Sequence, residues 1–174
     1  MKRRFLISGG GTGGHIFPAL AIAKEIERRY PHCVLLFVGA SDRMEMDKIP
    51  AAGYSITGLW ISGFQRSFSL KNFLFPIKLI FSVLRSFFII LRFNPEVVIG
   101  TGGYASGPIL WVASLLKIIT IIQEHNSYPG NTNKILSSNV SQICVAYPGL
   151  DRFFPKEKLH FTGNPNRAEI ELAV

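Results

Sequence analysis

Short apolar and β-branched runs alternate with longer helical stretches along the 174-residue chain. The strand-like runs include Arg4–Ser8, Cys33–Val38 and Ile118–Ile122, whose centres are continuously apolar. Such strands are typical of parallel sheets that are buried on both faces, and parallel neighbours need helical crossovers. The alternation therefore predicts an α/β fold built on a parallel sheet, with helices on both of its faces.

Further segments extend this pattern over the rest of the chain. Additional strands are expected at Tyr54–Ile61, Glu96–Ile99, Gln142–Val145 and His160–Thr162, and helices at Phe17–Tyr30, Ile109–Leu116 and Asn131–Leu136. No internal repeat, low-complexity tract or flexible linker interrupts the pattern. A chain of this length fits one compact domain.

The composition narrows the class of protein further. Apolar residues make up 48% and charged residues 17%, which excludes an intrinsically disordered chain. The 19 Lys and Arg residues exceed the 11 Asp and Glu residues and give a net charge of +8, so an anionic partner is expected. Cys33 and Cys144 lie in apolar runs and are expected to be buried, reduced thiols. The basic start Met1–Arg4 lacks a signal-peptide profile, so a cytosolic chain is expected.

A glycine-rich loop, Gly9–His15, comes directly after the first expected strand and before a helix. Glycines at this point let backbone N–H groups approach a phosphate or sugar, next to the positive end of a helix. A dinucleotide site would also need an acidic residue about 20 residues further on. Asp42, the nearest candidate, lies well beyond that distance. The loop therefore favours an anion or sugar site over a dinucleotide site.

Two more polar loops follow expected strands. Gly100–Pro108 is a second glycine-rich loop, and it adds the hydroxyl groups of Thr101 and Ser106. Two such loops at one sheet edge would form a cradle with room for a diphosphate. Gln123–Asn126 places four polar side chains after the strand Ile118–Ile122, and Glu124 could act there as a base or as a hydroxyl anchor.

The segment from Lys48 to Pro95 contains no Asp or Glu. Cations recur in it every seven residues, which places them on one side of a helix; they are Lys71, Lys78, Arg85 and Arg92. Pro76 is expected to kink or divide this helix. A cation at every seventh position argues against a membrane span. The stripe fits either a helix at an anionic membrane surface or a sheet-packing helix with a basic solvated face. The expected lipid contacts are Phe64, Phe68, Lys71, Phe73, Phe75 and Lys78, and nucleic acid is not an expected partner.

The ordered set of motifs resembles the MurG family, the UDP-N-acetylglucosamine:lipid I N-acetylglucosaminyltransferases of bacterial peptidoglycan synthesis. The matching motifs span nearly the whole chain; they are Gly9–Ala21, Asp42–Glu45, Ile61–Gly63, Gly102–Pro108, Asn126 with Thr132–Lys134, and Gly163–Pro165 with Arg167. The resemblance implies the N-terminal, Rossmann-like half of a glycosyltransferase of the GT-B type. Residues 1–165 would be the acceptor-binding domain, and residues 166–174 would begin the connection to a C-terminal donor-binding domain.

The resemblance also implies partners and a location. The co-substrate would be UDP-GlcNAc and the acceptor lipid I, with no further cofactor and no metal. The protein would act at an anionic membrane surface, peripherally on the cytoplasmic face of the bacterial plasma membrane. A non-catalytic module that binds a polyprenyl-diphosphate lipid remains an alternative. An oxidoreductase that uses a nucleotide cofactor would lack the acidic ribose partner.

Site residues follow from the resemblance position by position. The donor-binding positions are Thr12, Gly13, Gly14, Asn126 and Arg167, and the acceptor-diphosphate positions are Gly103, Tyr104 and Ser106. His15 and Glu124 are the candidate catalytic bases. The chain departs from the family at one motif, because Gln123 and His125 exchange the places of the family's His and Gln.

Overall fold

The computed structural model describes residues 2–63 and 74–165, which form one seven-stranded parallel sheet. The strands are β1 (Arg4–Gly9), β2 (Val34–Ala40), β3 (Ile56–Leu59), β4 (Val97–Gly102), β5 (Ile119–Glu124), β6 (Gln142–Val145) and β7 (Leu159–Phe161), in the spatial order β3-β2-β1-β4-β5-β6-β7. The predicted α/β fold with a parallel sheet is confirmed, and the strand order is that of a Rossmann-like domain with one added strand. Phe64, Phe68, Lys71, Phe73 and Arg167 lie outside the described residues.

Five helices connect the strands of the described chain. They are α1 (Gly13–Arg29), α2 (Glu45–Ala51), α3 (Phe75–Phe93), α4 (Ser106–Leu115) and α5 (Asn131–Leu136). Several expected boundaries were wrong, among them the start of α1, the start of α4 and the ends of β4 and β5. Helix α1 begins at Gly13, four residues before the predicted start at Phe17, because the glycine loop already turns into the helix. Strand β5 extends through Glu124, since the ladder continues with Glu124 opposite Val145 of β6.

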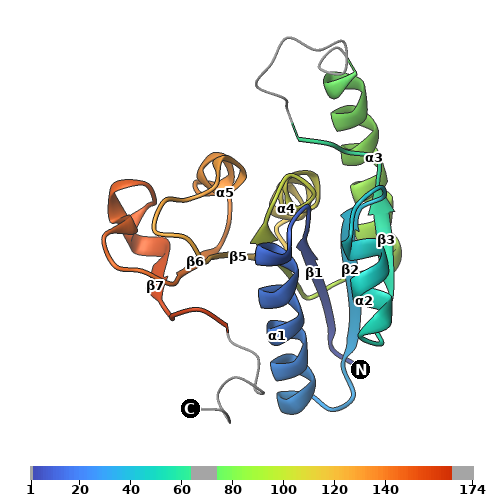
Figure 1. Ribbon diagram of the computed structural model, residues 1–174, viewed down its shortest axis with the longest axis horizontal. Coiled ribbons are helices and arrows are strands. Elements are labelled where there is room, and N and C mark those ends of the chain that lie inside the picture. Colours follow the sequence, from blue (N-terminus) through green and yellow to red (C-terminus); the bar gives the residue numbers. More distant parts are fainter. Residues whose placement is uncertain (1, 64–73, 166–174) are drawn as a thin grey trace.

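The helices cover both faces of the sheet (Figure 1), as predicted. On one face, α1 and α2 bury Ile16, Ala19 and Ile49 against β1 and β2. On the other face, α4 packs against the centre of the sheet with Ile109 and Leu110, which are fully buried. The sheet therefore holds two hydrophobic cores and is buried on both sides at its centre, which accounts for its continuous apolar strands.

Strands β1 and β4 lie side by side although three helices (α1, α2 and α3) and two strands separate them in sequence. The order of the strands reverses here, because the chain runs outward through β2 and β3 and then returns to the other side of β1. Open α/β sheets bind ligands outside the carboxyl ends of their strands at such a switch point. Both glycine-rich loops leave the sheet at this edge.

Helix α3 buries a narrow side made partly of small residues. Ser82, Ser86 and Ile90 are its buried residues, spaced four apart, and Ser82 Oγ donates to the Trp60 carbonyl at 3.1 Å. The expected kink at Pro76 was wrong, since Pro76 lies in the first turn of α3, where proline fits without a clash. No helix among the described residues is long and apolar enough to cross a membrane.

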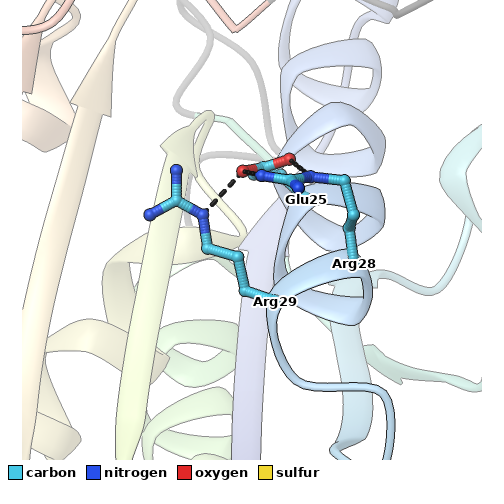
Figure 2. Close-up of polar contacts among 3 residues, drawn as sticks. All are labelled: Glu25, Arg28 and Arg29. Atoms are coloured by element: carbon cyan, nitrogen blue, oxygen red, sulfur yellow. Dashed lines mark hydrogen bonds and ion pairs between the residues drawn. The ribbon is translucent and has the colours of Figure 1, made fainter.

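The end of α1 carries an ion-pair cluster on its solvent side (Figure 2). Glu25 accepts hydrogen bonds from Arg28 Nε at 2.7 Å and from Arg29 Nε at 2.6 Å. These hydrogen bonds lower the pKa of Glu25 to about 2. The two arginines also lie in the last turn of the helix, where cations interact favourably with the helix dipole.

Candidate functional site

The two glycine-rich loops pack directly on each other at the carboxyl edge of the sheet. Gly10 N donates to Gly102 O at 3.4 Å, and Gly102 and Gly103 both have a positive φ, of 105° and 83°. A Cβ atom at Gly103 would also overlap the Gly10 carbonyl oxygen. Glycine is required there for both reasons, and the predicted meeting of two glycine loops at one sheet edge is confirmed.

His15 is held between these loops by a reciprocal pair of hydrogen bonds with Thr101. The Thr101 hydroxyl donates to the His15 carbonyl at 2.8 Å, and His15 Nδ1 lies 2.9 Å from the Thr101 carbonyl. A carbonyl oxygen only accepts, so Nδ1 carries the proton and Nε2 of the neutral ring keeps its lone pair. A Cβ atom at Gly102 would lie 2.6 Å from His15 Nδ1, so this glycine leaves room for the ring.

The surroundings of His15 favour its neutral form. Burial lowers its pKa below the ordinary value of 6.5, and the neighbouring His125 lowers it further, against the opposing effect of the Thr101 hydrogen bond. The His15 and His125 rings meet edge to face with their centroids 5.0 Å apart. His125 belongs to the third loop, so this contact brings all three loops together at one point.

The carboxylate of Glu124 is buried and saturated with hydrogen bonds. Its side chain is only 1% exposed. Oε1 accepts from the backbone N and from Nδ2 of Asn126, at 3.0 and 2.9 Å. Oε2 accepts from Gly130 N and from Asn133 Nδ2, both at 2.9 Å. Glu124 therefore fixes the shape of the third loop and positions Asn126, which is exposed at its surface.

The remaining predicted donor positions open helix α1. Thr12 is the N-cap residue and is exposed, and Gly13 and Gly14 form the start of the first turn. N–H groups in the first turn have no acceptor within the helix and carry the positive end of its dipole. A Cβ atom at Gly14 would lie 3.4 Å from His125 Nε2, so this turn faces the third loop.

The predicted acceptor positions shape the second loop. Ser106 is fully buried, and its hydroxyl donates to the Gly103 carbonyl at 2.8 Å. Tyr104 belongs to the second loop, and its ring packs against the first, since a Cβ atom at Gly11 would lie 3.3 Å from this ring. Burial raises the pKa of the Tyr104 phenol, so this hydroxyl remains a proton donor at neutral pH.

Glu45 is a site residue that was missed by sequence reasoning. It is fully buried under the first loop, where its carboxylate accepts from Gly11 N at 3.0 Å and from Ala40 N at 2.9 Å. Its side chain also occupies the space that a Cβ atom would need at Gly10. Only its place in the Asp42–Glu45 motif marked this residue, and the motif gave no indication that it braces the glycine loop.

Residues 2–63 and 74–165 contain no group of three or more His, Cys, Asp and Glu side chains placed to hold a metal ion. The candidate positions in this region are instead backbone amides at a helix N-terminus, hydroxyl groups and the imidazole of His15. Backbone amides and helix N-termini are the usual protein ligands of phosphate groups. The arrangement suits recognition of a phosphorylated sugar.

A Rossmann-like sheet with glycine loops gathered at its switch point is the architecture of the N-terminal half of a GT-B glycosyltransferase. Residues 5–145 match the N-terminal domain of glycosyltransferase family 28, and the chain belongs to this family.

Relatives and solved structures agree with this assignment. The chain is 59% identical over 96% of its length to a Flavobacterium psychrophilum protein, of which it covers 46%. It is 60% identical to a Christiangramia forsetii protein with the same coverage of both chains. Both are named UDP-N-acetylglucosamine--N-acetylmuramyl-(pentapeptide) pyrophosphoryl-undecaprenol N-acetylglucosamine transferase. The chain thus spans about half the length of the curated relatives it matches.

The crystal structure of Acinetobacter baumannii MurG is similar to this chain, with a TM-score of 0.80 and 27% identity over 97% of this chain and 48% of that one. The resemblance to the MurG family is confirmed. A UDP-N-acetylglucosamine 2-epimerase structure matches 94% of this chain and 49% of its own, with a TM-score of 0.68 and 12% identity. That likeness shows a shared fold.

Proposed function

We propose that this domain is the acceptor-binding half of an inverting glycosyltransferase that moves GlcNAc from UDP-GlcNAc to the MurNAc C4 hydroxyl of lipid I. The observation that carries the proposal is the meeting of three loops around His15, whose Nε2 has a free lone pair. The names of the relatives describe this transfer. Residues 1–165 would form this half, and residues 166–174 would lead toward the donor-binding half.

The proposed reaction is a single displacement. His15 Nε2 takes the proton of the C4 hydroxyl while the hydroxyl oxygen attacks C1 of GlcNAc from the face opposite UDP. The new glycosidic bond forms as the bond between C1 and the diphosphate breaks, and UDP leaves with the electron pair. Glu124 acts through the third loop, because its carboxylate is occupied in positioning Asn126.

The substrates would be divided between the loops. Thr12, Gly13 and Gly14 would contact the donor together with Asn126 and Arg167. The second loop would hold the acceptor diphosphate, with Gly103 and Tyr104 at its surface and the buried Ser106 fixing its shape. The open amides of a helix N-terminus stabilise negative charge, which both diphosphates carry. We propose that UDP-GlcNAc is a co-substrate and that no further cofactor takes part.

A transfer assay with the full-length protein tests this function. We expect labelled GlcNAc from UDP-GlcNAc to appear on a lipid I analogue, with UDP released in equal amount. The matched control is the same acceptor with hydrogen in place of the C4 hydroxyl, and it should accept no sugar. Binding of the acceptor without any transfer would instead support the non-catalytic lipid-binding module.

We further propose that α3 attaches the protein to an anionic membrane, peripherally on the cytoplasmic face of the plasma membrane. Its solvent side is largely apolar, with Ile80 60% and Phe88 66% exposed. Arg85 and Arg92 are exposed on the same helix, and Lys78 lies over the Trp60 ring at 5.5 Å. Apolar bulk with flanking cations is the pattern of helices that lie in an anionic interface.

Reversing the charge of Arg85 and Arg92 to Glu should weaken binding to anionic vesicles at least tenfold. Each cation near such a surface contributes on the order of 1 kcal/mol, and the new carboxylates would be repelled. Co-sedimentation with phosphatidylglycerol vesicles measures the effect. The control is Lys48→Glu with Arg152→Glu, which makes the same change of net charge away from α3. Equal losses in both double variants would contradict a specific role of α3.

A further inference from the structure

An apolar groove of about 620 Å³ lies between α3, α4 and α5. Its lining is almost wholly apolar and includes Leu79, Leu84, Tyr104, Pro108, Trp111 and Leu136. Its volume falls within the roughly 300–1,000 Å³ that is typical of small-molecule sites. Large apolar side chains remain accessible on its walls, with Trp111 41% and Leu84 52% exposed.

The groove is continuous with the second glycine-rich loop. Tyr104 belongs to that loop and also lines the groove, while its ring borders Gly11 of the first loop. Gly107 follows in the first turn of α4 and lines the groove as well. One end of the groove therefore lies beside the proposed position of the acceptor diphosphate.

The other walls of the groove lead to the exposed side of α3. Leu79, Ile80 and Leu84 contribute to the groove, and the apolar surface continues along the same helix at Phe88, one turn beyond Leu84. The groove thus connects the loop region with the surface that we propose faces the membrane. An apolar chain attached to the diphosphate would meet apolar side chains along this path.

We propose that the groove binds the first isoprene units of the polyprenyl chain that is attached to the acceptor diphosphate. The inference rests on the proposed function, since the acceptor named for the relatives is a pyrophosphoryl-undecaprenol. The covalent link places the first isoprene units next to the diphosphate, and the groove begins at that point. Its volume takes only the start of a long chain, so the remainder stays in the bilayer.

If the groove binds isoprene units, the affinity for the acceptor should depend on the length of its tail even where no membrane is present. Each methylene that moves from water into an apolar groove strengthens binding by about fourfold. Acceptor analogues with an identical head group should therefore bind more tightly as the tail grows, until the groove is full. A protein that contacts only the head group would show no such dependence in a vesicle-free solution.

The test uses the full-length protein in vesicle-free solution, with lipid I analogues of one and four isoprene units below their aggregation concentrations. We expect the acceptor KM of the wild type to fall at least tenfold with the longer tail. Leu84→Glu places a charge in the groove and should remove most of this fall. Phe88→Glu makes the same substitution one turn away, outside the groove, and should keep it. Both variants should keep the circular dichroism spectrum of the wild type, so that the comparison reports on the groove and not on folding.

The outcomes separate this proposal from the proposed function. If the wild type transfers sugar to neither analogue, the function itself fails. The groove proposal is overturned if transfer occurs but the KM of the wild type does not change with tail length. It is also overturned if both variants alter this dependence of KM equally. The groove would then be a bilayer contact or be filled by another part of the protein. Trp111 gives a readout without catalysis, because farnesyl diphosphate should change its fluorescence and inorganic pyrophosphate should not.

Discussion

Replacing His15 by alanine should lower the turnover number of the full-length enzyme by about 10²–10⁴-fold. The loss is expected because the substitution removes the proposed base, Nε2 of His15. The hydrogen bond from Nδ1 to the Thr101 carbonyl keeps the proton on Nδ1 and leaves Nε2 able to accept one. The fold should survive, since the side chain is only half-buried and a methyl group fits in its place. Steady-state kinetics with saturating acceptor and donor measure the effect.

His160→Ala serves as the matched control, because His160 lies on β7 at the far edge of the sheet and is exposed. Turnover by this variant should equal that of the wild type. The pH profile adds a second signature of His15. Its pKa is lowered by burial, so the base is neutral above this pKa and becomes protonated as the pH falls through it. The acid limb of kcat/KM should therefore lie below pH 6.5. An acid limb above that value, or near-normal turnover by His15→Ala, would contradict the mechanism.

Glu124→Gln should lower the free energy of unfolding by about 1–3 kcal/mol. The carboxylate accepts four hydrogen bonds from N–H groups, two on each oxygen. The side-chain amide of glutamine has only one oxygen that can accept them. The amide NH₂ group would face N–H donors of Asn126 or of Gly130 and Asn133, whichever way it turns. Denaturant unfolding of wild type and variant measures the difference.

Glu157→Gln is the control, because Glu157 lies in an exposed turn before β7 and should change stability little. The result also decides between two roles for Glu124. A variant with wild-type stability and no turnover would identify Glu124 as the base, against our assignment. A destabilised variant with an altered third loop would support the positioning role.

The strands of the sheet and the loops that follow them could be predicted from the sequence, because apolar strand cores and glycine-rich turns are local patterns. All seven predicted strands are present in the structure, including the short β6 at Gln142–Val145. The small helix α2 was missed, since seven residues that include Pro50 show little helical periodicity. The buried position of Glu45 depends on packing between α2 and the first loop, which no local pattern contains.

The sequence indicated which residues belong to the candidate site better than it indicated what each residue does there. The loops that carry His15, Gly103 and Glu124 were selected from their residue types, and the structure brings them together. The sequence could not separate a base from a brace, because that distinction depends on how many donors surround each group. It likewise gave no sign that His125, at the exchanged position of its motif, would contact the His15 ring.

The hydrogen bond that orients the His15 ring depends on the backbone of its neighbour. The acceptor is the main-chain carbonyl of Thr101, so every amino acid at position 101 would still offer it. The tautomer of the base is set by the alignment of β4 beside β1 and is independent of the side chain at position 101. A substitution of the buried Thr101 would remove the hydroxyl that donates to the His15 carbonyl but would leave the acceptor of the ring in place, whereas a one-residue slip of β4 would remove that acceptor.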